Sequence, residues 1–544
     1  MSKKMALLFS VLLAVGLVFF FRSSTGTGEE ARRQTLKPGS LSGEVRQAEG
    51  LYERLPKTLD PKSVRLCFRG EELACDRDTD TWYLPVDMDS ALWESGIFTD
   101  FEEGVRILPL LDYTALEKQA VVAEGQSVPL LAWNEAEESC TQIHVVFTGL
   151  PVVRMETDAD LDIDTVFAGS VVFYEDCGRQ DWTFSSVFQA NERGQTTRAF
   201  PKKGYRVNLI TVTSTGAVNE NPHPILGMRR SDSWIFYAIY SDGTKVRDRF
   251  GIELWNGFGA ENTGYDSHYG THLEYAELIV NGEYRGLYGI MEPVDCTQLQ
   301  ISDQEYLYKR TLGRELLPEL FDLTAPDDYL NVLGMEIKGR DGNGSRADWK
   351  CFRDYVELSG APDEIFSEGM EQLLDMGNTT DMWLYLQMIY GEDNIYKNMF
   401  FAFKKEPDGY RMYLVPWDVD MSWGNVYNGV EEDLYTTHDP ERAEQYLEWP
   451  MLDRMLALDI GGIRERVRKR WESLRQEELS DGRMEAVLGE CIHQVQDSGA
   501  FARDAARWPD SAHDGDYDSL RAFMERRMNF LDKNIENMDE WIQE

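Results

Sequence analysis

The chain has 544 residues, of which 42% are hydrophobic and 12% aromatic, so it is long enough for two or three folded units and is not a low-complexity protein. Lys and Arg total 55 against 96 Asp and Glu, which gives a formal net charge of -41. A surface this acidic repels phosphate backbones and anionic lipid, so we expect no nucleic-acid partner, and any membrane contact needs a dedicated apolar segment.

An apolar segment of this kind lies at the N-terminus. Lys3 and Lys4 precede an uncharged apolar run from residue 5 to residue 21, and Arg22 follows it. At about 1.5 Å per residue, a helix of this length just spans a thin bilayer. We therefore expect residues 1–22 to be a signal anchor, with a cleaved signal peptide as the alternative. Because the two lysines stay in the cytoplasm, the protein would be a single-pass membrane protein with its bulk extracytoplasmic, or secreted if the segment is cleaved.

Two regions follow the apolar segment. Residues 23–60 are polar and charged and are interpreted as a linker with one short helix at most. Residues 61–150 are predicted to form a small β-sandwich-like domain, because short apolar runs alternate with turn residues there. These runs lie at residues 64–66, 82–84, 128–133 and 143–147. No catalytic constellation appears among them, so this region is expected to be a spacer or a binding module.

The remaining residues, 151–544, are predicted to form one larger domain of the α+β class. Strand patterns come first, at residues 170–174, 183–189, 205–213, 233–240 and 276–291. Asn281-Gly282 inside the last of these predicts a hairpin, because type I′ turns need positive φ at both central residues. After about Thr379 the periodicity becomes helical and stays so nearly to the end, with a break at Trp508-Pro509. A β-rich half therefore precedes an α-rich half.

The seven cysteines are sparse and show no zinc-like spacing. Outside the cytoplasm one or two disulfides could form, with Cys67–Cys75 the nearest pair in the sequence. Isolated buried thiols are the alternative, and the sequence does not separate the two.

The stretch that carries chemistry is residues 391–424. Asp393 and Asn398 have four residues between them and precede an apolar, strand-like run. A second apolar run then ends in Asp418 and Asp420. This pattern puts a carboxylate and an amide at the mouth of a hairpin and further carboxylates at the end of its return strand. Protein kinases place their acceptor-orienting Asp and their metal-binding Asn and Asp in this way. A solvated turn beside a buried Trp is the structural alternative.

The chain from about residue 151 to the C-terminus resembles the CotH family of spore-coat-protein-H-like atypical kinases. The pattern strand-N-G-x-Y-x-G-x-Y-x-x-x-E within residues 276–295 is the most distinctive part of the resemblance. The other matching segments come in the family's order: residues 202–207, 242–256, 306–309, 335–339, the D-x-x-x-x-N and PWDVD segments, and the helical tail at 506–508 and 520–532.

The resemblance implies an atypical protein-kinase-like fold that uses ATP with Mg²⁺ or Mn²⁺. Carried over residue by residue, Asp393 would be the catalytic residue that orients the acceptor hydroxyl. Asn398 and Asp418 would hold the metal at the catalytic centre. Asp420 would be a second metal ligand or a structural cap.

The resemblance also implies contacts to the nucleotide. Lys203 is the candidate for the phosphate-binding lysine, and Arg206 and Arg247 are rivals for phosphate contacts. Glu292 would orient the lysine or touch the nucleotide. A surface carboxylate at a strand end is the alternative for Glu292.

The function expected from these observations is an extracytoplasmic, ATP- and metal-dependent protein kinase that phosphorylates Ser or Thr of surface or coat proteins. The acidic surface favours a basic acceptor segment. Asn208 and the pair Gly391-Glu392 depart from the usual family pattern, which leaves room for a pseudokinase. A non-catalytic surface scaffold or adhesion protein with a kinase-like fold is the second hypothesis, and a phosphotransferase acting on a small molecule or glycan is the third.

Overall fold

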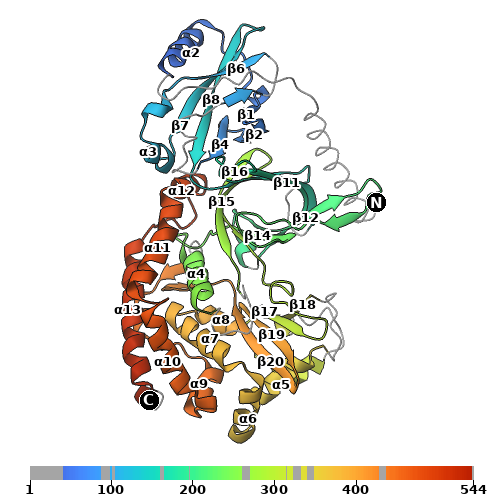
Figure 1. Ribbon diagram of the computed structural model, residues 1–544, viewed down its shortest axis with the longest axis vertical. Helices are drawn as coiled ribbons and strands as arrows, with labels where there is room; N and C mark the ends of the chain where they lie inside the picture. Colours follow the sequence, from blue (N-terminus) through green and yellow to red (C-terminus); the bar gives the residue numbers. More distant parts are fainter. Residues whose placement is uncertain are drawn as a thin grey trace. The chain divides into compact units, whose positions relative to one another are not determined.

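The computed structural model describes residues 41–86, 98–100, 104–159, 165–194, 196–259, 270–313, 315–322, 333–339, 348–427 and 436–541 (Figure 1). The chain divides into two compact units, each built from three stretches of sequence. Unit 1 comprises Met1–Tyr240, Leu273–Glu292 and Ile492–His513, and unit 2 comprises Ser241–His272, Pro293–Cys491 and Asp514–Glu544. The predicted boundary between residues 150 and 151 therefore lies inside unit 1.

Two small sheets form the first part of unit 1, after helix α2 (Ser42–Arg54). One sheet has the order β2-β1-β5 and the other has the order β3-β4-β8-β7-β6, in which only the β4–β8 pair is parallel. The elements are β1 (Leu66–Phe68), β2 (Glu71–Glu72), β3 (Ala74–Asp76), β4 (Thr81–Pro85), β5 (Phe98–Asp100), β6 (Val105–Pro109), α3 (Lys118–Ala123), β7 (Ser127–Asn134) and β8 (Ser139–Thr148). Strands β4, β7 and β8 confirm three of the four predicted apolar runs, and α2 is the short helix expected in the linker.

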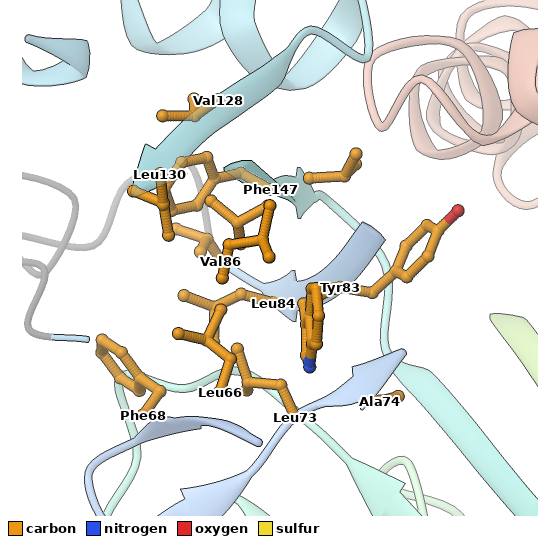
Figure 2. Packing of buried hydrophobic residues seen from close by; sticks show 14 of the residues in the cluster. Leu66, Phe68, Leu73, Ala74, Tyr83, Leu84, Val86, Val128, Leu130 and Phe147 are labelled. Atoms are coloured by element: carbon orange, nitrogen blue, oxygen red, sulfur yellow. The ribbon is translucent and has the colours of Figure 1, made fainter. Parts of the chain in front are cut away.

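The core of these two sheets continues into the next part of unit 1. Figure 2 shows apolar side chains such as Leu84, Leu130 and Phe147 gathered between the strands. The same buried cluster includes residues of the later sheet, and the ring of Tyr83 stacks on that of Tyr284 with 5.1 Å between centroids. One buried cluster therefore spans the two parts of unit 1, and the later sheet also has a core of its own.

The main sheet of unit 1 has the order β11-β10-β9-β15-β16-β14-β12-β13, and an added β11–β12 pairing closes it on itself. All its pairs are antiparallel except β9–β15. The strands are β9 (Val152–Glu156), β10 (Phe167–Tyr174), β11 (Thr183–Arg193), β12 (Gly204–Val212), β13 (Val218–Glu220), β14 (Ser233–Tyr237), β15 (Leu273–Val280) and β16 (Glu283–Met291). The five predicted strand segments are all confirmed, the last as the hairpin β15–β16.

Two sequence patterns of this sheet are borne out in detail. Tyr205, Val207 and Leu209 on β12 are buried, as alternation of apolar and polar residues requires. At the β15–β16 turn, Asn281 has φ 53° and Gly282 has φ 72°, the backbone of a type I′ turn.

A buried ionic cluster ties helix α12 (Ala500–Arg507) to strand β16 within unit 1. The Lys202 Nζ lies 2.7 Å from Asp504 Oδ1 and donates to the Leu287 carbonyl at 2.6 Å. The Leu287 amide also donates to Asp504 Oδ1 at 2.9 Å, and His513 Nε2 lies 2.9 Å from Asp504 Oδ2. Asp504 is therefore surrounded by donors. We call these four residues the Asp504 cluster.

Unit 2 contains a four-stranded antiparallel sheet of order β18-β17-β19-β20, a short hairpin β21–β22, and helices (Figure 1). Its strands are β17 (Tyr306–Arg310), β18 (Met335–Lys338), β19 (Met399–Glu406), β20 (Gly409–Pro416), β21 (Asn425–Tyr427) and β22 (Thr436–His438). The described helices not yet named are α4 (Arg247–Gly259), α5 (Lys350–Ser359), α6 (Asp363–Leu373), α7 (Met376–Ile389), α8 (Glu392–Tyr396), α9 (Pro450–Ala457), α10 (Ile463–Gln476), α11 (Asp481–Gln496), α13 (Tyr517–Glu536) and α14 (Met538–Trp541).

The mixed α+β class is confirmed, but helices begin earlier than predicted. Helices α4, α5 and α6 all precede Thr379. Helix α5 buries Cys351, Phe352 and Val356, and α6 buries Phe366 and Met370, which is the one-sided burial of an amphipathic helix; the sequence prediction missed both. Helix α7 is buried on nearly every side, and the predicted break at Trp508 follows the end of α12.

Two further predictions concern the membrane and the cysteines. In the part of the chain that the structure describes, no helix combines the length and apolarity needed to cross a bilayer, and the predicted anchor at residues 1–22 lies outside the described residues. All seven cysteines are free, Cys67 and Cys75 included, so the alternative of isolated thiols is the one that the structure supports.

Candidate functional site

The hairpin β19–β20 brings the predicted metal-binding residues to one end of the unit 2 sheet. Asn398 directly precedes β19, and Asp418 follows the end of β20 by two residues. The Trp417 amide donates to the Asn398 carbonyl at 3.1 Å, which continues the pairing of Met399 with Pro416. The predicted hairpin is confirmed, although Asp393 lies on the short helix α8 that precedes it.

Both residues at the ends of this hairpin have left-handed backbone conformations. Asn398 has φ 56° and Asp418 has φ 58°. For most non-glycine residues this conformation costs about 1–2 kcal/mol, and Asn and Asp tolerate it better than the others. It turns the chain out of the strand direction. Strain of this kind is typical of functional sites, where surrounding contacts hold it in place.

Asp393 and Asn398 are hydrogen-bonded to each other. Asn398 Nδ2 donates to Asp393 Oδ2 at 2.7 Å, and Lys397 Nζ lies 3.2 Å from the same oxygen. Burial raises the pKa of Asp393 above its ordinary value; Lys397 opposes this shift, and the negative charge of Asp418 adds to it. The amide and the carboxylate that the sequence pattern paired are thus direct neighbours.

Three carboxylates converge beside this pair. One oxygen from each of Asp248, Asp418 and Asp420 lies within 4.8 Å of the others. Asp248 is in the first turn of α4 and accepts a hydrogen bond from the Val419 amide at 2.9 Å, between the two other acids in the sequence. We call these three residues the acidic cluster.

The electrostatics of the acidic cluster favour a bound cation or a bound proton. Burial, together with the charges of Asp418, Asp393 and Asp242, raises the pKa of Asp420 to about 8. Like charges this close cannot all ionise without cost. Carboxylate oxygens are the ligands that Mg²⁺, Mn²⁺ and Ca²⁺ prefer, so the donor set fits a hard divalent cation.

Asp242 fixes the helix that carries Asp248. It accepts hydrogen bonds from the Thr244 amide at 3.0 Å and from the Arg247 amide at 2.9 Å, and it pairs with the Arg247 guanidinium. Burial opposes ionisation of Asp242, but Arg247 and these hydrogen bonds hold its pKa below the ordinary value. Arg247, predicted as a phosphate contact, is buried and belongs to this group of contacts around Asp242.

The other predicted nucleotide contacts lie in unit 1. Lys203 Nζ donates to the Arg198 carbonyl at 2.6 Å and lies 3.3 Å from Glu192, while Arg206 is half-buried on β12. Glu292, which was expected to orient this lysine, takes part in neither of these two interactions of Lys203.

Glu292 is only 1% exposed, so the alternative of a surface carboxylate is wrong for this residue. Its Oε1 accepts from the Arg229 amide at 2.8 Å, and its Oε2 lies 3.4 Å from Arg229 Nε. The structure thus pairs Glu292 with Arg229.

Sequence reasoning missed Asp248. The segment of residues 242–256 was recognised, but Asp248 was not separated from its neighbours Arg247 and Arg249. An acidic residue in the first turn of a helix usually has a structural role, because its negative charge interacts favourably with the helix dipole there. Only the fold reveals its proximity to Asp418 and Asp420.

A comparison with protein families gives one match. A family model described as "CotH kinase protein" matches residues 190–531, which is well over half of the chain and includes all of the predicted site residues. A comparison with curated proteins gives no match.

Proposed function

This chain belongs to the CotH family, and from that premise we propose that it is an ATP- and metal-dependent protein kinase that phosphorylates Ser or Thr of surface or coat proteins outside the cytoplasm. The observation that carries the proposal is the acidic cluster at the end of the β19–β20 hairpin, beside the hydrogen-bonded pair Asp393 and Asn398. A protein that served only as a scaffold would have no need for three carboxylates whose oxygens lie within 4.8 Å of one another.

The proposed roles follow from the chemistry of the side chains. Asp418, Asp420 and Asp248 would hold a divalent cation, and Asn398, which directly precedes β19, is proposed as a further ligand. Mg²⁺ or Mn²⁺ bound there would neutralise the charge of the ATP phosphates. The cation would also relieve the repulsion within the acidic cluster.

Asp393 would act on the acceptor. Its carboxylate is held by Asn398 and Lys397, so it can orient a hydroxyl group and accept its proton. A pKa raised by burial makes this carboxylate a better base than an exposed Asp. The protonated form loses this ability.

The substrates are proposed from charge and from the predicted topology. A net charge of -41 favours a basic acceptor segment around the Ser or Thr. Lys203 and Arg206 remain the proposed contacts to the ATP phosphates. Residues 1–22 would tether the enzyme to the membrane.

The test is transfer of labelled phosphate from ATP, with Mg²⁺ or Mn²⁺, to the protein itself and to basic Ser-rich peptides. Asp393→Ala and Asp418→Ala are expected to abolish transfer. Asp408→Ala is the matched control, because Asp408 is exposed in the turn at the opposite end of the same hairpin. Absence of transfer, together with absence of metal-dependent ATP binding by calorimetry, would favour the scaffold hypothesis.

A further inference from the structure

Asn394 fastens the two ends of the hairpin that carry the proposed metal ligands. It follows Asp393 on helix α8, and its side chain is 0% exposed. Its Nδ2 donates to the Asn398 carbonyl at 3.0 Å and to the Trp417 carbonyl at 2.8 Å. One amide group thus contacts the residue before β19 and the residue before Asp418.

These two carbonyls control the backbone of the proposed ligands. The Asn398 carbonyl belongs to the peptide plane that sets ψ of Asn398. The Trp417 carbonyl belongs to the plane that sets φ of Asp418, which is 58°. Holding both oxygens therefore holds both left-handed residues, whose conformations are unfavourable on their own.

The chemistry of the contact requires an amide. Nδ2 carries two protons, one for each carbonyl, and a carboxylate in its place would face two carbonyl oxygens without a donor. Space is also reserved for this side chain, because a Cβ added to Gly391 would lie 3.1 Å from Asn394 Oδ1. The pair Gly391-Glu392, which departs from the usual family pattern, thus includes a glycine that makes room for Asn394.

We propose that Asn394 is a positioning residue that holds Asn398 and Asp418 in their left-handed conformations and thereby sets the affinity of the acidic cluster for a divalent cation. This inference rests on the proposed function of the site. Residues that hold metal ligands by hydrogen bonds without binding the metal typically lower metal affinity about 10–100-fold when they are removed.

The chain contains a matched control in Asn378. This residue is also 0% exposed and also binds the backbone of the β20 strand, because its Nδ2 donates to the Leu414 carbonyl at 3.0 Å and its Oδ1 accepts from the Leu414 amide at 2.6 Å. Leu414 lies inside the strand and not at its end. Loss of Asn378 should therefore cost stability as loss of Asn394 does, without releasing the proposed ligands.

The experiment measures Mn²⁺ binding to the purified full chain by electron paramagnetic resonance of the free ion. We expect Asn394→Ala and the isosteric Asn394→Asp to weaken Mn²⁺ binding at least about tenfold. We expect Asn378→Ala to stay within about twofold of the wild type, since its contacts lie away from the ligands. Near-ultraviolet circular dichroism confirms that each variant is folded.

The outcomes separate this inference from the proposed function. Unchanged Mn²⁺ affinity in folded Asn394 variants, or equal weakening by Asn378→Ala, overturns the positioning role alone. No Mn²⁺ binding by the wild type, or equal binding by Asp418→Asn, overturns the proposed function with it. If neither Asn394 variant folds, the side-chain amide resonances of ¹⁵N-asparagine-labelled wild type decide: Mg²⁺ must shift Asn394 more than Asn378, and equal shifts overturn the inference.

Discussion

Two aspartates, one in each unit, show how differently a fold can surround a carboxylate. In the Asp504 cluster of unit 1, Lys202, the Leu287 amide and His513 surround the carboxylate with donors. In the acidic cluster of unit 2, Asp420 meets Asp248 and Asp418. A buried charge is tolerated when partners compensate it. Asp504 has a lysine among its partners, whereas Asp420 accepts a hydrogen bond from Ser241 Oγ at 3.4 Å and lies beside two other carboxylates.

We interpret this difference as the one between a structural carboxylate and one proposed to bind a cation. The Asp504 cluster joins three stretches of the chain that are far apart in the sequence, and it is complete without any added group. The acidic cluster consists of carboxylates whose charges repel one another, and protons or a cation would relieve that repulsion. The comparison predicts that removing a partner of Asp504 destabilises the protein and that removing the charge of Asp420 stabilises it. The experiments below follow in order of decreasing expected effect.

The largest effect is expected from Lys202→Met. Removing the cation leaves Asp504 charged and fully buried, which typically costs about 3–5 kcal/mol. Hydrogen exchange of peptides from β16 and α12 should show a matching loss of protection. Lys469→Met is the control: its side chain is 74% exposed, that of its partner Glu465 is 60% exposed, and their ion pair should contribute less than about 1 kcal/mol. Unchanged protection in Lys202→Met would contradict a structural role for the cluster.

A stabilising effect of intermediate size is expected from Asp420→Asn in the metal-free protein. The pKa of Asp420 is raised to about 8 in the folded chain, against about 4 in an unfolded one. The contribution of this group to stability is therefore full below pH 4 and is lost as the pH rises through 8. The side chain of the Asp420→Asn variant cannot ionise, so the variant should keep the stability that the wild type loses as the pH rises. It should therefore unfold at a higher temperature than the wild type at pH 9.

Thermal unfolding in a chelator between pH 5 and 9 provides the measurement, with each regained kcal/mol worth about 2–4 °C. Added Mn²⁺ should reverse the order, because the wild type binds the cation better and gains more stability from it. Parallel pH profiles for the two proteins would show that Asp420 is not under electrostatic strain.

The smallest effect is expected from Lys397→Met. Lys397 lies 3.2 Å from Asp393 and lowers its pKa against the effect of burial. Without this cation the pKa of Asp393 rises further, so the acidic limb of the pH profile of phosphate transfer should move to higher pH. Because Lys397 is 35% exposed, solvent screening keeps the shift small. If the acidic limb of the pH profile does not move, a group other than Asp393 is the base.

The sequence predicted those parts of the site that are continuous along the chain. Asp393, Asn398, Asp418 and Asp420 were found because one hairpin and the turn before it contain all of them. Asp248 was missed because its proximity depends on how α4 packs, which no local pattern encodes.

The two adjacent lysines illustrate the same limit. Lys203 is the predicted phosphate-binding lysine, and the structure shows that its neighbour Lys202 is the fully buried residue of the pair. Adjacent positions point to opposite faces of an extended chain, and the sequence alone does not say where the strand begins. The buried environment of Glu292 escaped prediction for a similar reason, since Arg229 is distant in the sequence.

The central claim is that the acidic cluster binds a divalent cation, and a crystal structure grown with Mn²⁺ tests it most directly. The account predicts an anomalous peak with oxygen ligands from Asp418, Asp420 and Asp248 at about 2.0–2.6 Å, the range of hard-cation bonds. Occupied Mn²⁺ sites elsewhere, with no peak among these three carboxylates, would contradict it.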